Sequence, residues 1–87
     1  MKYYKITNKL EFHNGYQYKN GMNILPDIFN DDENVICGAG GFYFTTAEHI
    51  HNFYYLGENV RVIEIPKNKH CKVISTNNIY RSNMIIY

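Results

Sequence analysis

The sequence predicts an α+β domain: an antiparallel or mixed sheet of five to six strands with one helix, at about residues 46–56, packed on one face. Its 87 residues allow a single small domain, 1–87, because a chain of this length buries only one modest core. The composition favours strands, since the chain has 9 Tyr and 5 Phe, together with many isoleucines, and little alanine or leucine to form helices. One segment nevertheless carries the signals of a helix.

Strands are predicted where aromatic and β-branched residues alternate or cluster between turn residues. These segments are Tyr3–Thr7, Tyr16–Lys19, Met22–Leu25, Phe42–Thr45, Val60–Ile65, Cys71–Ser75 and Tyr80–Tyr87. Asn-Gly pairs at 14–15 and 20–21 are typical of tight hairpin turns, so the first strands after Thr7 should form a small meander. The almost unbroken apolar run 60–65 predicts a central strand covered on both faces.

The helix is predicted from a capping box, in which Thr45 and Glu48 would satisfy each other's free amides. Ile50 and Tyr54 fall on one face at helical spacing, and Gly57 stands where the helix should end. The expected core combines this face with the apolar sides of the strands. It comprises Ile6, Tyr18, Ile24, Phe42, Phe44, Ile50, Phe53, Tyr54, Val62, Ile63, Ile65, Val73, Ile74 and Ile85.

Charge and cysteine content exclude several classes of partner and compartment. The net charge is +1, which provides no field for nucleic acid or for a membrane surface, and no apolar run is long enough to span a bilayer. The N-terminus lacks the apolar stretch of a signal peptide, so secretion is not expected. Cys37 and Cys71 are predicted to be free thiols in a reducing compartment.

No pattern predicts a catalytic residue, a metal ligand or a bound cofactor. The acidic segment 27–34 lacks the spacing of a calcium loop and is predicted to be a solvated loop. The glycine cluster 38–41 precedes a strand rather than a helix, so it lacks the helix N-terminus that phosphate binding uses. The histidines at 13, 49, 51 and 70 lack the spacing of zinc ligands and are expected at the surface.

Arg61 and Arg81 are the two arginines of the chain, and both fall on predicted strands beside apolar residues. The arginine fork suits the capture of a carboxylate or phosphate. Each arginine is therefore expected either to pair with an acidic neighbour at a sheet edge or to contact a partner.

Seven segments occur in an order that is typical of one family. They are Tyr4–Asn8, His13–Tyr18, Gly21–Leu25, Phe29–Asp31, Gly40–Thr45, Arg61–Pro66 and Arg81–Ile86. With them the chain resembles, over essentially its whole length, an uncharacterised domain that recurs in paralogous proteins of giant DNA viruses of the mimivirus type. In many of those proteins the domain stands before an array of ankyrin repeats. The richness in Asn, Ile, Tyr and Lys agrees with their AT-rich genomes.

Two segments depart from the pattern of that family. The family tends to have Cys-Cys-Pro-Gly-Gly where this chain has Cys37–Gly41, which removes one cysteine and weakens any shared metal or redox role. It also tends to have Trp-Arg-Ala-Asn where this chain has Tyr80–Asn83, which keeps an aromatic-arginine pair.

The resemblance implies a domain whose biochemical role is not established. Because the candidate catalytic residues Cys37, His49, Glu64 and His70 fall on separate elements, we expect a non-enzymatic, adaptor-like domain that binds an unknown host or viral protein, in the host cytoplasm or the virion. Ankyrin arrays bind proteins over extended surfaces, which supports this interpretation. The alternative is an ADP-ribosyltransferase-like or NAD-binding domain, because residues 41–44 followed by a helix resemble part of that enzyme core. Its pocket would need Tyr43 and Glu64. A terminal edge strand, Tyr80–Tyr87, could also pair two copies into a homodimer.

Overall fold

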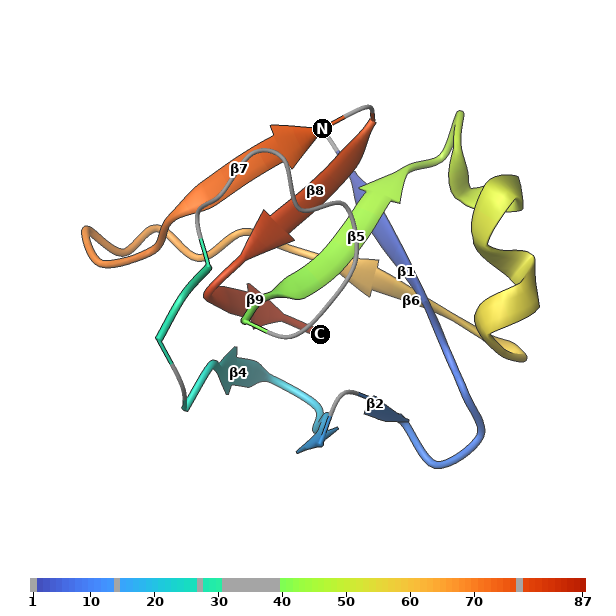
Figure 1. The fold of residues 1–87 in the computed structure, drawn as a ribbon, viewed down its shortest axis with the longest axis horizontal. Helices are drawn as coiled ribbons and strands as arrows, with labels where there is room; N and C mark the ends of the chain where they lie inside the picture. Colours follow the sequence, from blue (N-terminus) through green and yellow to red (C-terminus); the bar gives the residue numbers. More distant parts are fainter. Residues whose placement is uncertain (1, 14, 27, 31–39, 77) are drawn as a thin grey trace.

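The computed structural model describes residues 2–13, 15–26, 28–30, 40–76 and 78–87 and shows a mainly β domain (Figure 1). Its longest strands form an antiparallel five-stranded sheet in the order β6-β1-β5-β8-β7. These strands are β1 (Tyr3–Thr7), β5 (Phe42–Thr46), β6 (Asn59–Ile63), β7 (Val73–Thr76) and β8 (Ile79–Ser82). The first strand of the chain therefore lies inside the sheet, between two later ones.

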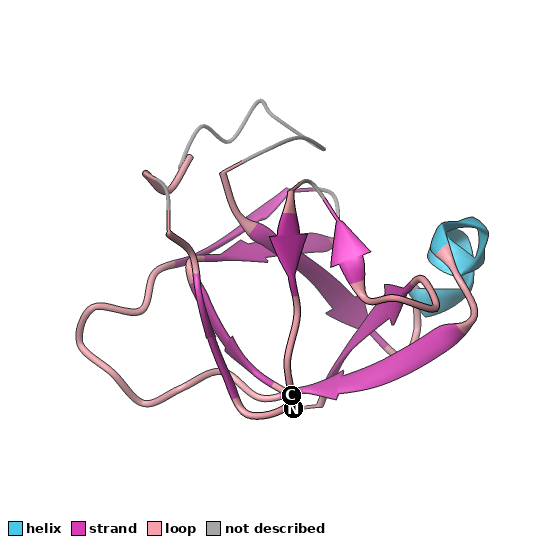
Figure 2. Cartoon of the chain, turned by 90° about the horizontal axis from the view of Figure 1, so that it is seen from below, coloured by secondary structure: helices cyan, strands magenta, loops and turns pink. Residues whose placement is uncertain are grey.

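Two short strand pairs complete the domain. One pairs β2 (Phe12–His13) with β3 (Tyr16–Gln17), which confirms the first predicted hairpin, and Gly15 in its turn has φ +77°. The other pairs β4 (Met22–Ile24) with β9 (Met84–Ile86). A bridge between Glu64 and Ile86 then joins β9 to the end of β6, so the strands curl around a common interior (Figure 2).

The predicted second hairpin is wrong, because β4 pairs with the C-terminal β9 and not with β3. The fully buried Asn23 explains the change. Its side chain accepts from Lys19 N and donates to Lys19 O and Gly21 O, at 2.8–3.2 Å. This amide closes the 20–21 turn on itself and leaves β4 free to reach the other end of the chain.

The predicted strand Tyr80–Tyr87 is divided at Asn83 into β8 and β9. The Asn83 side chain accepts from Lys72 N at 2.7 Å and donates to His70 O at 2.9 Å, which anchors the bend. Because β8 pairs with β5 and β7, and β9 pairs with β4, this segment does not supply the sheet edge that was expected for a homodimer. The edges of the five-stranded sheet are β6 and β7.

The predicted helix at 46–56 is confirmed only in part. Thr45 is buried in β5, and its hydroxyl donates to Asn78 O at 2.7 Å, so it is not available as a cap. The strand continues through Thr46, and only a 3₁₀ helix, η1 (Ile50–Leu56), follows it. None of the η1 residues is buried, and Figure 2 shows the helix outside the strands. The fold is mainly β rather than a sheet with a packed α-helix.

The apolar run 60–65 forms an edge strand and not a central one. Burial alternates along β6, so Val60 and Val62 are more than half exposed while Ile63 is buried. Arg61 shares the inner face with Ile63 by strand alternation. The run is apolar because aliphatic residues occupy exposed as well as buried positions of the strand, and not because both faces of the strand are covered.

The core is built mainly from aromatic rings. Its buried members are Tyr18, Phe42, Phe44, Ile63 and Ile85, with Tyr3, Tyr16, Leu25, Ile65, Tyr80 and Tyr87 packed around them. Phe44 stacks on Tyr80 with ring centroids 5.6 Å apart, and Tyr18 stacks on Tyr87 at 5.4 Å. The first pair reinforces the β5–β8 ladder, in which Phe44 and Tyr80 are direct partners, and the second joins two residues outside the named strands.

The predicted core is confirmed at six positions, where the side chains are buried: Ile6, Tyr18, Phe42, Phe44, Ile63 and Ile85. Four predicted members are instead exposed: Ile24, Tyr54, Val62 and Val73. Another four are half-buried: Ile50, Phe53, Ile65 and Ile74. Most of the errors fall on η1 and the edge strands. Cys37, Gly38 and Ala39 lie outside the described residues, as does most of the acidic segment.

Replacing Ile85 by alanine should lower the free energy of unfolding by about 2–5 kcal/mol, because this fully buried side chain would leave a cavity. Tyr54→Ala on the exposed side of η1 should cost less than about 0.5 kcal/mol, the range of surface substitutions. Urea titrations followed by tyrosine fluorescence measure both. Equal losses would show that η1 belongs to the core.

Candidate functional site

The two arginines predicted from the sequence differ in their environment: Arg61 is partly exposed and Arg81 is buried. Arg61 forms an ion pair with Glu11, with Nε 3.1 Å from Oε1, and donates to the Asn20 side chain. Its guanidinium also lies 4.4 Å from the centre of the Tyr87 ring. This confirms an acidic neighbour for Arg61, whose side chain remains about 30% exposed.

Arg81 is buried and packs inside the domain rather than at the surface. Its guanidinium lies over the Tyr43 ring at 5.7 Å and donates to the Tyr43 hydroxyl at 3.4 Å. Gly41 lies against the aliphatic stem of Arg81, where a Cβ atom would overlap it. The arginine is thus part of the contact between β5 and β8. Position 41 must be glycine because the Arg81 side chain occupies the space that a Cβ atom would need.

The two residues of the alternative NAD pocket are not brought together. Tyr43 lines the pocket described below, whereas Glu64 lies at the bridge to Ile86 and is not among the residues that line it. Among the described residues, no cluster of His, Cys, Asp or Glu could hold a metal ion. Nor does any helix in the described ranges have the length and apolarity to cross a membrane.

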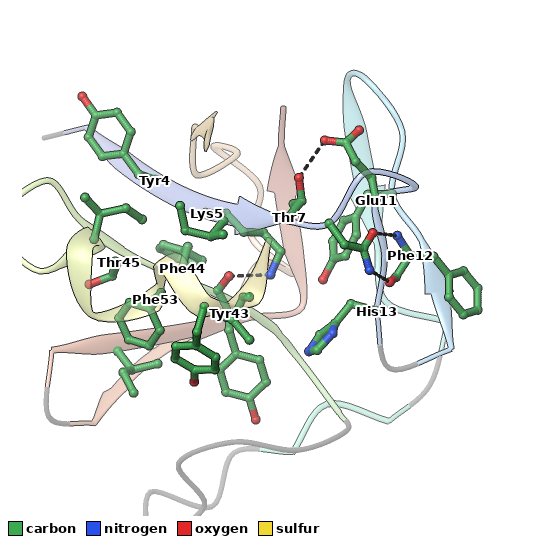
Figure 3. A pocket seen from close by; sticks show the side chains of 17 residues that line it. Tyr4, Lys5, Thr7, Glu11, Phe12, His13, Tyr43, Phe44, Thr45 and Phe53 are labelled. Carbon is green, nitrogen blue, oxygen red and sulfur yellow. Dashed lines mark hydrogen bonds between the residues drawn. The ribbon is translucent and has the colours of Figure 1, made fainter. Parts of the chain in front are cut away.

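Lys5 is the unusual residue of the structure, because it is a lysine with only 6% of its surface exposed. It lies where β1 and β5 separate. The two strands share only the pairs Tyr3↔Thr46 and Tyr4↔Thr45, while β1 continues along β6 through Thr7. Beyond Tyr4 the Lys5 side chain crosses the gap and donates from Nζ to Tyr43 O at 2.7 Å (Figure 3). The ammonium therefore links β1 to β5 beyond the last residue pair of their ladder.

The charge on Lys5 is poorly compensated. In the described part of the chain, no carboxylate lies within ion-pair distance of it, and its other neighbour is the Tyr18 ring, 4.9 Å from Nζ. Burial lowers the pKa of Lys5 from 10.5 to about 7. Burial, and then the positive charge of Lys5, lower the pKa of His13 as well. Burial raises the pKa of Tyr18, so this ring stays protonated.

The gap between the two strands opens into a pocket of about 270 Å³, which we call the gap pocket. Its polar end is formed by Lys5, Thr7, Glu11 and His13, with Tyr18 beside them. The other end lies under η1 and is formed by Ile50, Phe53, Tyr55, Leu56 and Ile79. Figure 3 shows Lys5 reaching from β1 toward Tyr43, with His13 directed into the same space from β2.

Glu11, which also lines this pocket, is already engaged. Its carboxylate receives the Thr7 hydroxyl at 3.0 Å and the Arg61 guanidinium at 3.1 Å. The ion pair with Arg61 neutralises this acid, so the uncompensated charge at the polar end is that of Lys5. A buried cation at one end and hydrocarbon at the other make the pocket amphipathic.

Sequence analysis missed Lys5, and it placed His13 only as a surface residue. One signal was available: strand alternation puts Lys5 on the same face as Tyr3 and Thr7. However, a lysine between apolar residues ordinarily points to solvent, and the separation of β1 from β5 cannot be read from either strand alone.

A second feature is a set of exposed apolar side chains on two consecutive elements, which we call the outer face. They are Tyr54, Tyr55 and Leu56 of η1 and Val60 and Val62 of β6, exposed by 38–76%. Only residues 57–59 separate the two groups along the chain. Exposed apolar side chains that lie close together along the chain of a small domain are candidates for a contact surface.

Comparisons with known proteins identify relatives of the whole chain. An uncharacterised protein of Acanthamoeba polyphaga mimivirus is 44% identical over 86 residues, which cover 97% of this chain and 62% of that protein. The chain is a mimivirus-type domain. Two further proteins of that virus, named as ankyrin-repeat proteins, are 40% identical over 87 residues and 34% identical over 87 residues.

The chain spans less than two thirds of these relatives: 43% and 18% of the two ankyrin-repeat proteins, although 97% of the chain itself is matched each time. The domain therefore recurs as a unit within longer proteins of different size. No protein-family model matches the chain, and no solved structure matches it.

Lys5 should make stability depend on pH. The unfolded chain holds this proton up to about pH 10.5 and the folded chain only to about 7, so folding releases it between these values and stability rises with pH. The free energy of unfolding should increase by about 3 kcal/mol from pH 7 to pH 9.5. Urea titrations at both values measure it.

Lys5→Met is the control for this dependence, since it keeps the length of the side chain and removes the charge. It should abolish the rise and make the protein more stable at pH 7. The same rise in the variant as in the native chain would assign the effect to other groups.

Proposed function

We propose that this domain is a non-enzymatic protein-interaction module of a giant virus, acting as an adaptor in the infected cell or in the virus particle. The observation that carries the proposal is that 97% of this chain is matched within proteins named as ankyrin-repeat proteins. Ankyrin arrays bind proteins over a concave surface. A domain that accompanies them in chains of different length is suited to add a second contact.

The outer face is the surface that we assign to this contact. Its five side chains combine two tyrosines with three aliphatic residues and contain no charge. Aromatic residues at the centre of an interface contribute most of its binding energy, and their rings lose little conformational entropy. The neighbouring β6 is an edge strand of the sheet, which places the two valines at the border of the domain.

The partner that we propose is an ankyrin-repeat array of the kind that the relatives contain. Where domain and array share one chain, each meets the other at a high effective concentration, so contacts between them form even when they are weak. The apolar side chains of the outer face would then be buried against the array. The same contact between separate chains would link this domain to an array-bearing protein.

Isothermal calorimetry tests the proposal. The domain is titrated with the ankyrin-repeat region of the relative that is 40% identical to it over 87 residues. We expect saturable binding, weakened at least roughly tenfold by Val62→Glu, because a charge would be buried in an apolar contact. Val73→Glu is the matched control, since Val73 is also an exposed valine but lies on β7, the opposite edge strand. It should bind as the native domain does.

Two results would overturn the proposal. One is the absence of binding by the native domain, and the other is an equal loss in the Val62 and Val73 variants. Titration with NAD in the same instrument separates the alternative function. Saturable NAD binding that is lost in Glu64→Gln would replace the adaptor by a nucleotide-binding domain.

A further inference from the structure

We propose that the gap pocket binds a small monocarboxylate with an apolar body, whose carboxylate meets the Lys5 ammonium between β1 and β5. This site is separate from the outer face in its chemistry, and it does not depend on a protein partner. The inference rests on three properties of the described residues: an incompletely used buried cation, the balance of charges around it, and the apolar chamber beneath η1.

The Lys5 ammonium has donors to spare. An ammonium carries three N–H groups, and the described residues provide one acceptor, Tyr43 O at 2.7 Å. The Tyr18 ring, 4.9 Å from Nζ, favours a cation at this place but accepts no conventional hydrogen bond. An anion within the pocket would occupy the remaining donors.

The surrounding charges fit one negative charge and not two. The groups that face Lys5 from the packed elements are Glu11, His13, Tyr18, Tyr43 and Arg61. Glu11 and Arg61 neutralise each other at 3.1 Å. Burial and Lys5 lower the pKa of His13, so His13 is neutral at pH 7, and the high pKa of Tyr18 keeps that ring uncharged. One uncompensated cation remains, which matches a carboxylate better than a phosphate dianion.

The rest of the pocket selects the body of the ligand. Beneath η1 the lining is formed by Ile50, Phe53, Tyr55, Leu56 and Ile79, which are uncharged and mostly apolar. Its volume of about 270 Å³ lies just below the range of about 300–1,000 Å³ that is usual for small-molecule sites. A short alkyl chain or a single aromatic ring fits these limits, and a nucleotide does not.

Octanoate is a suitable probe, with octanol and octyl phosphate as the neutral and the more highly charged probes of equal chain length. Calorimetry on the 87-residue domain at pH 6.5 should show octanoate binding at least roughly tenfold tighter than octanol, because a charge-assisted hydrogen bond contributes about 1.5–3 kcal/mol. Octyl phosphate should bind more weakly than octanoate. The Lys5 side-chain NMR signals should shift on octanoate addition.

Lys5→Met should lower the affinity for octanoate to that for octanol while leaving octanol binding in place, which shows that the variant retains the chamber. Lys2→Met is the matched control, because Lys2 is exposed and precedes the same strand, and it should bind octanoate like the native domain. Octanoate affinity should also fall as the pH rises from 6 to 9, since Lys5, with a pKa of about 7, loses the proton that the carboxylate needs.

The proposal is overturned if octanoate binds no tighter than octanol, if Lys5→Met leaves its affinity unchanged, or if octyl phosphate binds at least as well. Loss of binding to the ankyrin-repeat array has no bearing on these readouts. The two proposals can therefore fail independently.

Discussion

The separation of β1 from β5 after two residue pairs is the constraint on which the rest of the domain depends. Sheets are stable when every inner carbonyl and amide is paired, and a gap between inner strands would ordinarily admit water. Here the Lys5 ammonium fills part of the gap and binds Tyr43 O. This keeps the carbonyl satisfied, but it brings a charge into the interior, which burial makes costly and which lowers the pKa of the amine. The gap pocket and the expected pH dependence of stability both follow from that arrangement.

Contacts between aromatic side chains in the core hold strands together where backbone hydrogen bonds between them are few or absent. Rings link strands that share few or no ladder bonds: Tyr3 contacts both Phe44 and Tyr80 with centroids 5.2 Å apart, and Tyr18 stacks on Tyr87. Aromatic pairs of this geometry add about 0.5–1.5 kcal/mol each beyond the burial of their surface. A core of tyrosines also carries hydroxyls inward. Tyr16 donates to Asn23, whereas the buried Tyr87 hydroxyl has no partner among the described residues.

Local patterns predicted most strands because the alternation of residue types is a property of each segment by itself. What failed depended on partners distant in the chain. Thr45 has the sequence signature of a helix cap, but Asn78, 33 residues away, takes its hydroxyl. The run 60–65 resembles a central strand, but its position at the edge is decided by which strands lie beside β1. Arg61 could be predicted to have an acidic partner, although not that it would be Glu11. Lys5 was missed for the same reason, since its burial results from a gap between two strands.

The two proposed binding regions share one structural element, and this has a thermodynamic consequence. Tyr55 and Leu56 of η1 line the gap pocket and are also exposed on the outer face. The helix is a short 3₁₀ segment without a side-chain cap or buried residues, so it is held largely by its contacts with β1. A ligand beneath η1 that changed its position would alter the affinity of the outer face for a protein. By linkage, the protein would then alter the affinity of the pocket for its ligand by the same factor. A module of this size can therefore couple a small molecule to an interaction surface through a single helix.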